Sequence, residues 1–118
     1  MRVQGEIALL HEVRLKGKRL MTEWHLYMIR CRGGALYTGI ATDIARRLDE
    51  HETDTRRGAR YLRGKGPLEL VLQRAIGRRG LAQRIESRIK RLSKVRKEQL
   101  VLHDDLFEAL LTWAAGLD

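Results

Sequence analysis

Cysteine, proline and long apolar runs are all scarce in this chain of 118 residues. The single cysteine, Cys31, excludes an internal disulfide and a cysteine-rich zinc site. One proline and a 43% content of hydrophobic residues are typical of a globular chain rather than a disordered one. No apolar run approaches the roughly 20 residues that span a bilayer, and no signal-peptide pattern is found. We therefore expect a cytoplasmic protein that does not enter a membrane.

The whole chain has a net charge of +9, and its basic residues are gathered in one block. Residues 1–55 carry 9 basic and 8 acidic side chains, residues 56–99 carry 15 and 3, and residues 100–118 carry four acids without a base. Such a block attracts polyanions and releases the counterions of a phosphate backbone. A solubilising surface would explain a single basic helix, and a lipid surface would need an aromatic insertion face. The excess favours nucleic acid as the partner.

The chain divides into an extension of uncertain structure at residues 1–20 and a single domain at residues 21–118. Within the domain, β-forming residues and helical periodicity predict the order β-β-α-β-α-α-α. The strands are expected at 24–30, 35–39 and 68–75, and the helices at 44–51, 81–92, 94–102 and from about 106. The helix N-caps are expected at Thr42 or Asp43, at Ser93, and at Asp104 or Asp105. The predicted fold is α/β (α+β): a small three-stranded β-sheet with an antiparallel hairpin, covered by helices, with the direction of the third strand left open.

The two hairpin strands each carry a tyrosine, Tyr27 and Tyr37. Because side chains alternate between faces along a strand, a two-residue turn at Gly33-Gly34 would place the tyrosines on opposite faces of the sheet. They share a face only if the connection has an odd number of residues or a bulge. For a shared face we predict a three-residue loop at Arg32–Gly34 with a left-handed Gly34. Taken singly, each tyrosine would more often serve strand packing.

Two polar residues of the first predicted helix lie next to its apolar stripe. At about 100° per residue, Arg47 and His51 lie one turn apart next to that stripe, whereas Arg46 points nearly the opposite way. An arginine and a histidine aimed at a sheet need an anion or a partner there. The alternative is that Arg47 pairs with Asp43 on the surface and that His51 is an ordinary residue at a helix end.

Glu86 is the only acid between Leu70 and Lys97. A glutamate among bases commonly neutralises its neighbours, here most directly Lys90, one turn further on. It would equally suit a hard divalent cation, which takes carboxylate oxygen and keeps several waters for phosphate chemistry. One carboxylate by itself leaves both interpretations open.

Together, these segments resemble the motif series of the GIY-YIG nuclease superfamily. The matching segments are Leu26-Tyr27-Met28, Tyr37-Thr38-Gly39, Asp43–Leu48 with His51, and Ile85–Leu92 around Glu86. The small stand-alone bacterial subfamily is the most similar, through Tyr37–Asp43 and Leu62–Pro67. The first motif reads Leu-Tyr-Met in place of Gly-Ile-Tyr, with its tyrosine retained. Many members place an asparagine after the glutamate, and this sequence has none.

The resemblance implies an endonuclease that hydrolyses phosphodiester bonds with one divalent cation, Mg2+ or Mn2+. Glu86 would hold the cation, and Arg47 would contact the scissile phosphate. One tyrosine of Tyr27 and Tyr37 would orient or deprotonate the attacking water, and His51 would hold the network. DNA rather than RNA is the expected substrate, with a role in repair or recombination. The residues expected to contact nucleic acid are Arg46, Arg60, Arg63, Lys65 and Arg88.

Two further hypotheses come from other functional classes. The first is a nucleic-acid-binding module without catalysis on the same fold, since a fold does not establish an activity. Such a module would have no reason to keep an acid at Glu86. The second is a scaffold that binds a partner protein through the acidic C-terminal helix. Exposure of Leu106, Leu110 and Trp113 would favour it.

Overall fold

The computed structural model describes residues 23–53 and 66–116. Its elements are β1 (Trp24–Arg30), β2 (Leu36–Ala41), α2 (Ile44–Thr53), β3 (Glu69–Gly77), α3 (Arg79–Lys90), α4 (Lys94–Leu102) and α5 (Asp104–Ala115). The expected order β-β-α-β-α-α-α is confirmed. The expected extension at residues 1–20 lies outside the described residues, as do three bases expected to bind nucleic acid: Arg60, Arg63 and Lys65.

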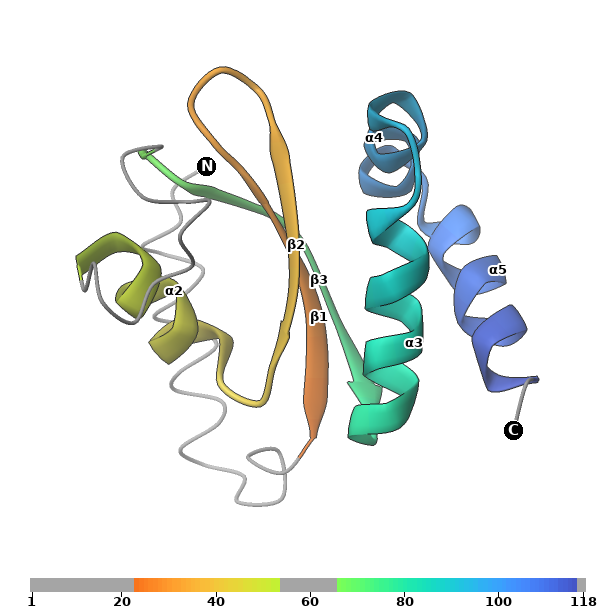
Figure 1. The fold of residues 1–118 in the computed structure, drawn as a ribbon. Coiled ribbons are helices and arrows are strands. Elements are labelled where there is room, and N and C mark those ends of the chain that lie inside the picture. Colours follow the sequence, from red (N-terminus) through yellow and green to blue (C-terminus); the bar gives the residue numbers. More distant parts are fainter. Residues whose placement is uncertain (1–22, 54–65, 117–118) are drawn as a thin grey trace.

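The three strands form one antiparallel sheet in the order β2-β1-β3, so the expected three-stranded sheet is confirmed and β3 runs antiparallel to β1. Helix α2 covers one face of the sheet, and α3, α4 and α5 cover the other (Figure 1). Each face has its own apolar core. The α2 face buries Ile29, Ile44 and Leu48, whereas the opposite face buries Ile85 and Phe107 among others. No helix within residues 23–53 and 66–116 is long and apolar enough to cross a membrane.

The hairpin has the predicted three-residue loop, Arg32–Gly34. The amide of Cys31 donates to the carbonyl of Ala35 at 2.8 Å, and this hydrogen bond joins the two residues that flank the loop. Gly33 and Gly34 have φ angles of 92° and 95°, a region that favours glycine because it has no Cβ. The odd loop length pairs Ile29 with Tyr37 and thereby puts Tyr27 and Tyr37 on the same face.

Two of the three predicted helix caps are confirmed. The Asp43 carboxylate accepts the backbone N–H of Arg46 at 3.0 Å ahead of α2, and the Ser93 hydroxyl accepts that of Arg96 ahead of α4. The predicted cap of α5 is wrong. His103 occupies that position without a side-chain cap bond, and Asp104 lies in the first turn of the helix, where its carboxylate pairs with Arg74 of β3.

Element boundaries shift where tertiary pairing overrides the local pattern. Strand β3 extends to Gly77, beyond the predicted end at residue 75, because Trp24 of β1 pairs with Gly77. Helix α3 ends at Lys90, before Leu92, and the amide of Leu92 donates to Ile89 in a tighter final turn.

An ion pair between Arg30 of β1 and Glu98 of α4 ties this helix to the hairpin. Both guanidinium nitrogens of Arg30 reach the Glu98 carboxylate, at 2.7 and 2.9 Å, and Lys94 adds a further contact at 2.6 Å. Two parallel bonds of this kind give both attraction and a defined orientation. The hydrogen bond from Arg30, followed by that from Lys94, lowers the pKa of Glu98 from 4.5 to about 2.

Candidate functional site

Three rings meet on the α2 face of the sheet. Tyr27 on β1 and Tyr37 on β2 have ring centroids 6.5 Å apart, and His51 of α2 lies 6.4 Å from Tyr27 and 5.7 Å from Tyr37. The Tyr27 hydroxyl is 3.2 Å from Nε2 of His51, within hydrogen-bonding distance. His51, in the last turn of α2, is therefore a buried member of the tyrosine cluster.

Gly39 makes room for the Tyr27 ring. The two residues are directly paired across β1 and β2. A Cβ at position 39 would lie 2.5 Å from the Tyr27 hydroxyl oxygen and 2.6 Å from Cζ, closer than such atoms can approach. Tyr27 is only 1% exposed, so its ring has little space to retreat. Gly39 thus determines where the hydroxyl sits.

Arg47 brings a positive charge to the same cluster. It forms an ion pair with Glu50, three residues further on, at 3.0 Å, while the Asp43 carboxylate caps the helix. Its hydrogen bond and charge both oppose the rise in the pKa of Tyr27, so the guanidinium acts directly on that hydroxyl. The Arg47 side chain is 34% exposed, so an anion from solvent can approach it.

Burial keeps Tyr27 and His51 uncharged. Desolvation is the main cause that raises the pKa of Tyr27, and the nearby Tyr37 and Glu86 add to it. Desolvation, followed by the charge of Arg47, lowers the pKa of His51 from 6.5 to about 4. At neutral pH the tyrosine is therefore protonated and the imidazole is neutral, so the hydrogen bond between them joins two uncharged groups.

Glu86 lies on α3, in the helical layer on the other side of the sheet from the cluster. It follows the buried Ile85 on α3, which packs against the opposite face of the sheet, and its charge still reaches the Tyr27 hydroxyl. The expected pairing with Lys90 is confirmed, with Nζ and Oε2 3.2 Å apart. The Glu86 side chain is 21% exposed, so it is partly accessible to solvent.

The two other described residues expected to bind nucleic acid lie in different places. Arg46 is 74% exposed, and its guanidinium lies 3.9 Å from the Glu50 carboxylate, which also pairs with Arg47. Arg88 lies elsewhere, with its guanidinium 5.6 Å from the centre of the Trp113 ring of α5. The structure thus brings Arg46 near Arg47 but directs Arg88 away from the tyrosine cluster.

Two contributors to the cluster, Gly39 and Glu50, escaped the sequence interpretation. Gly39 belongs to the Tyr-Thr-Gly segment, but its closeness to Tyr27 depends on the strand register. Glu50 lies three residues after Arg47, a spacing that commonly forms ion pairs on a helix. The spacing of three could have indicated Glu50 as the partner of Arg47, but Asp43, at a spacing of four, was considered in its place.

The donor set suits a cation that keeps most of its water. The described part of the chain holds no group of three or more His, Cys, Asp or Glu side chains that could enclose a metal ion. Magnesium commonly binds through one or two carboxylates and completes its shell with water and substrate phosphate. A single, partly exposed carboxylate at Glu86 fits that mode, and it does not fit a dedicated protein cage.

Comparisons with known proteins identify the family of this chain. The family model for the GIY-YIG catalytic domain matches residues 23–99. The UPF0213 protein YhbQ of Salmonella typhimurium is 54% identical over 92 residues, covering 78% of this chain and 90% of that protein. A UPF0213 protein of Citrobacter koseri is 54% identical over 91 residues, covering 77% and 89%. The solution NMR structure of UPF0213 protein BH0048 from Bacillus halodurans is similar, with 40% identity, a TM-score of 0.45, and coverage of 67% and 82%. The chain belongs to the GIY-YIG nuclease family.

Proposed function

We propose that this protein is a metal-dependent endonuclease that hydrolyses phosphodiester bonds in DNA, in the context of repair or recombination. One observation carries the proposal. Tyr27, Tyr37 and His51 meet on one face of the sheet, and Arg47 of the same helix as His51 lies beside the Tyr27 hydroxyl. General acid–base chemistry on a phosphate requires this kind of convergence before any question of pKa.

The two tyrosines take different parts in this proposal. Tyr27 is 1% exposed and bonded to His51, and its raised pKa opposes ionisation, so it serves as a fixed hydroxyl that orients the network. Tyr37 is only half-buried, and its ring lies edge-on to His51. An attacking water can therefore reach Tyr37 more readily than Tyr27. We assign contact with that water to Tyr37.

Arg47 and Glu86 act on the phosphate from two sides. The partly exposed Arg47 guanidinium binds the scissile phosphate and stabilises the charge that grows on it. Glu86 is the residue that would hold a magnesium or manganese ion, and the ion supplies Lewis-acid polarisation of the phosphoryl oxygen. Glu50 keeps Arg47 in place at 3.0 Å.

Substrate binding in this proposal is assigned to basic residues of α2 and of the segment that follows it in the sequence. Arg46 stands exposed next to Arg47. Arg60, Arg63 and Lys65 belong to the basic segment that follows α2 in the sequence. Contacts of this kind bind any phosphate backbone and leave the choice of target to the shape of the substrate.

The test is a cleavage assay on branched, flapped, single-stranded and duplex substrates of DNA and RNA, each with magnesium, manganese or chelator. The unmodified protein should cut at least one DNA substrate with metal and none with chelator. Glu86→Gln should lower cleavage by about a hundredfold or more while nucleic-acid binding holds or tightens, because the domain gains positive charge. Arg47→Ala should likewise stop cleavage, with a modest loss of binding.

Matched variants separate chemistry from charge. Glu108→Gln makes the same charge change on an exposed position of α5 and should leave cleavage intact. Arg46→Ala removes a neighbouring cation and should weaken binding without abolishing cleavage. If Glu86→Gln cuts as well as the unmodified protein in the presence of metal, the assignment of Glu86 is wrong. If no substrate is cut under any condition, the protein is a nucleic-acid-binding module.

A further inference from the structure

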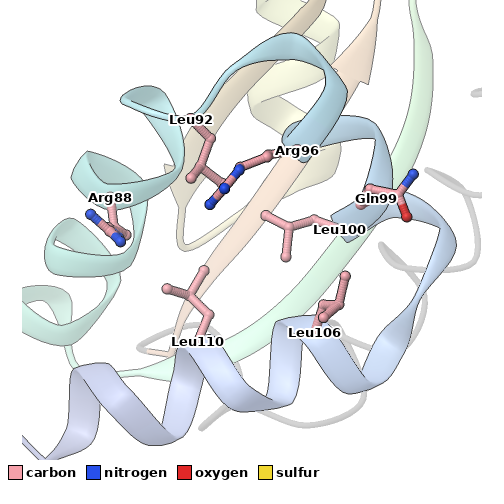
Figure 2. Close-up of a pocket in the computed structure, with 7 residues that line it drawn as sticks. All are labelled: Arg88, Leu92, Arg96, Gln99, Leu100, Leu106 and Leu110. Atoms are coloured by element: carbon pink, nitrogen blue, oxygen red, sulfur yellow. The ribbon is translucent and has the colours of Figure 1, made fainter.

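A groove lies between α3, α4 and α5, on the layer that faces away from the tyrosine cluster. Its volume is about 340 Å³, within the range of sites that hold a ligand. Figure 2 shows four leucine side chains directed into the space between the helices, with two arginines at its α3–α4 side. The leucines are Leu92, Leu100, Leu106 and Leu110, and the remaining lining residues are Arg88, Arg96 and Gln99.

Part of this apolar lining is open to solvent. Leu106 is 42% exposed, and Trp113, whose ring contacts Arg88 at the groove, is 45% exposed. Leu110, one turn beyond Leu106, is half-buried. The three residues lie on one stripe of α5 with spacings of four and three, the pattern by which a helix contacts a partner. This is the exposure that the scaffold hypothesis predicted for Leu106 and Trp113.

The charge of the groove points to the chemistry of the partner. Its lining includes two guanidinium groups and no acid. Neither Arg88 nor Arg96 forms an ion pair within the two described stretches of the chain, and the Arg88 guanidinium rests on the Trp113 ring. Exposed cations beside an apolar floor favour a ligand that combines apolar anchors with carboxylates.

We propose that this groove binds an acidic amphipathic segment of a partner protein, with apolar side chains in the leucine floor and carboxylates on Arg88 and Arg96. A nucleic-acid strand fits less well, because the four leucines offer neither stacking surface nor hydrogen bonds to bases. A second copy of this chain fits less well because the acids of α5 do not face the groove. Glu108 lies two residues from both Leu106 and Leu110, about 200° around the helix.

The groove lies within the helical layer, whereas the tyrosine cluster lies on the other face of the sheet. On α3, Arg88 lines the groove, and Glu86, two residues earlier, lies about 200° away around the helix. A bound segment would therefore leave the proposed catalytic face uncovered. Such a segment would tether a small domain to its site of action, and the binding itself does not depend on the domain being a nuclease.

The experiment is a selection of helix-forming peptides from a phage-displayed library on the folded, full-length chain. The selected sequences should share apolar residues spaced one turn apart and flanking Asp or Glu. A synthesised, labelled winner should bind Leu106→Glu and Arg96→Glu proteins about tenfold or more weakly, because each change removes a side chain that lines the groove. Circular dichroism should show both variants folded, since the two side chains are exposed.

Two control variants keep the same chemistry outside the groove. Leu102 is 70% exposed and does not line the groove, and Arg91 is an exposed base at the end of α3. Leu102→Glu and Arg91→Glu should bind the peptide as the unmodified protein does. Equal loss in the controls, selected peptides without acids, or no selected peptide would overturn the proposal. So would a concentration-dependent dimer that Leu106→Glu dissolves, or competition for the groove by single-stranded DNA.

Discussion

A single methyl group at position 39 should disable the tyrosine cluster while leaving the fold in place. In Gly39→Ala the new Cβ would lie 2.5 Å from the Tyr27 hydroxyl oxygen. Ordinary contacts of this kind begin at about 3.5 Å, so the hydroxyl must move by roughly 1 Å. The backbone at position 39 does not lie in the left-handed region, so the strain falls on Tyr27 alone.

The displacement has two measurable consequences. The hydrogen bond between Tyr27 and His51, at 3.2 Å, should break. The buried polar atoms would then lack a hydrogen-bond partner, which should lower the free energy of unfolding by about 1–3 kcal/mol. A misplacement of about 1 Å in a catalytic group can lower the rate by about a hundredfold, so we expect cleavage to fall by that order. Single-turnover cleavage and urea unfolding measure the two effects separately.

Two further variants isolate the cause. Gly116→Ala adds the same methyl at an ordinary contact distance of 3.5 Å and should change neither cleavage nor stability appreciably. Tyr27→Phe should lower cleavage, and combining it with Gly39→Ala should add little, because both changes remove one placed hydroxyl. A folded Gly39→Ala protein that cleaves at the unmodified rate would refute this reasoning.

Three other predictions concern pH, stability and salt. Folded His51 has a pKa of about 4 and the unfolded residue 6.5, so the unfolded chain binds the extra proton. The free energy of unfolding should then fall by up to about 3 kcal/mol as the pH drops from 6.5 to 4, and urea titrations of His51→Gln should lack this decline. Folded Glu98 has a pKa of about 2 against 4.5, so its contribution is full above 4.5 and disappears as the pH approaches 2. At pH 7, Glu98→Gln should lower the free energy of unfolding by about 1–3 kcal/mol, and an unchanged denaturation midpoint would contradict the role of the Arg30–Glu98 pair. Arg60→Ala and Arg63→Ala should each weaken DNA binding and reduce the salt slope by about 0.9 for each phosphate that the protein no longer neutralises, without stopping residual cleavage. An unaltered slope in a fluorescence titration would place those bases outside the interface.

Much of the architecture follows from local pattern. The alternation and aromatic content of 24–30, the glycines at 33–34 and the spacing of Leu81, Ile85 and Ile89 predict strands, a turn and a helix, because these periods match the two backbone geometries. The parity of the hairpin loop could be predicted too, since only an odd loop puts both tyrosines on one face. The cap of α5 was missed because Asp104 pairs with Arg74, a residue 30 positions earlier.

The candidate site was identified by the order of its motifs, and spacing alone would have left its residues ambiguous. Within α2 the helical period correctly put Arg47 and His51 on the side facing the sheet. It could not choose Glu50 as the partner of Arg47, because Asp43 satisfies the helical spacing equally well. The spacing along one helix does not show which of the two ion pairs, Arg47–Asp43 or Arg47–Glu50, is more stable. That depends on the surroundings of each carboxylate in the folded protein.

The sequence by itself determined the element types, the order of elements and the apolar faces of the helices, because these depend on neighbours within a few positions. Only the tertiary structure decided that β3 pairs with β1 in an antiparallel direction and that Tyr27 meets His51, 24 positions later in the chain. It likewise produced the groove between α3, α4 and α5, whose lining comes from three helices. The physical reason is that burial drives each element onto the sheet without regard to chain distance, and the contacts that result do not appear in any local pattern.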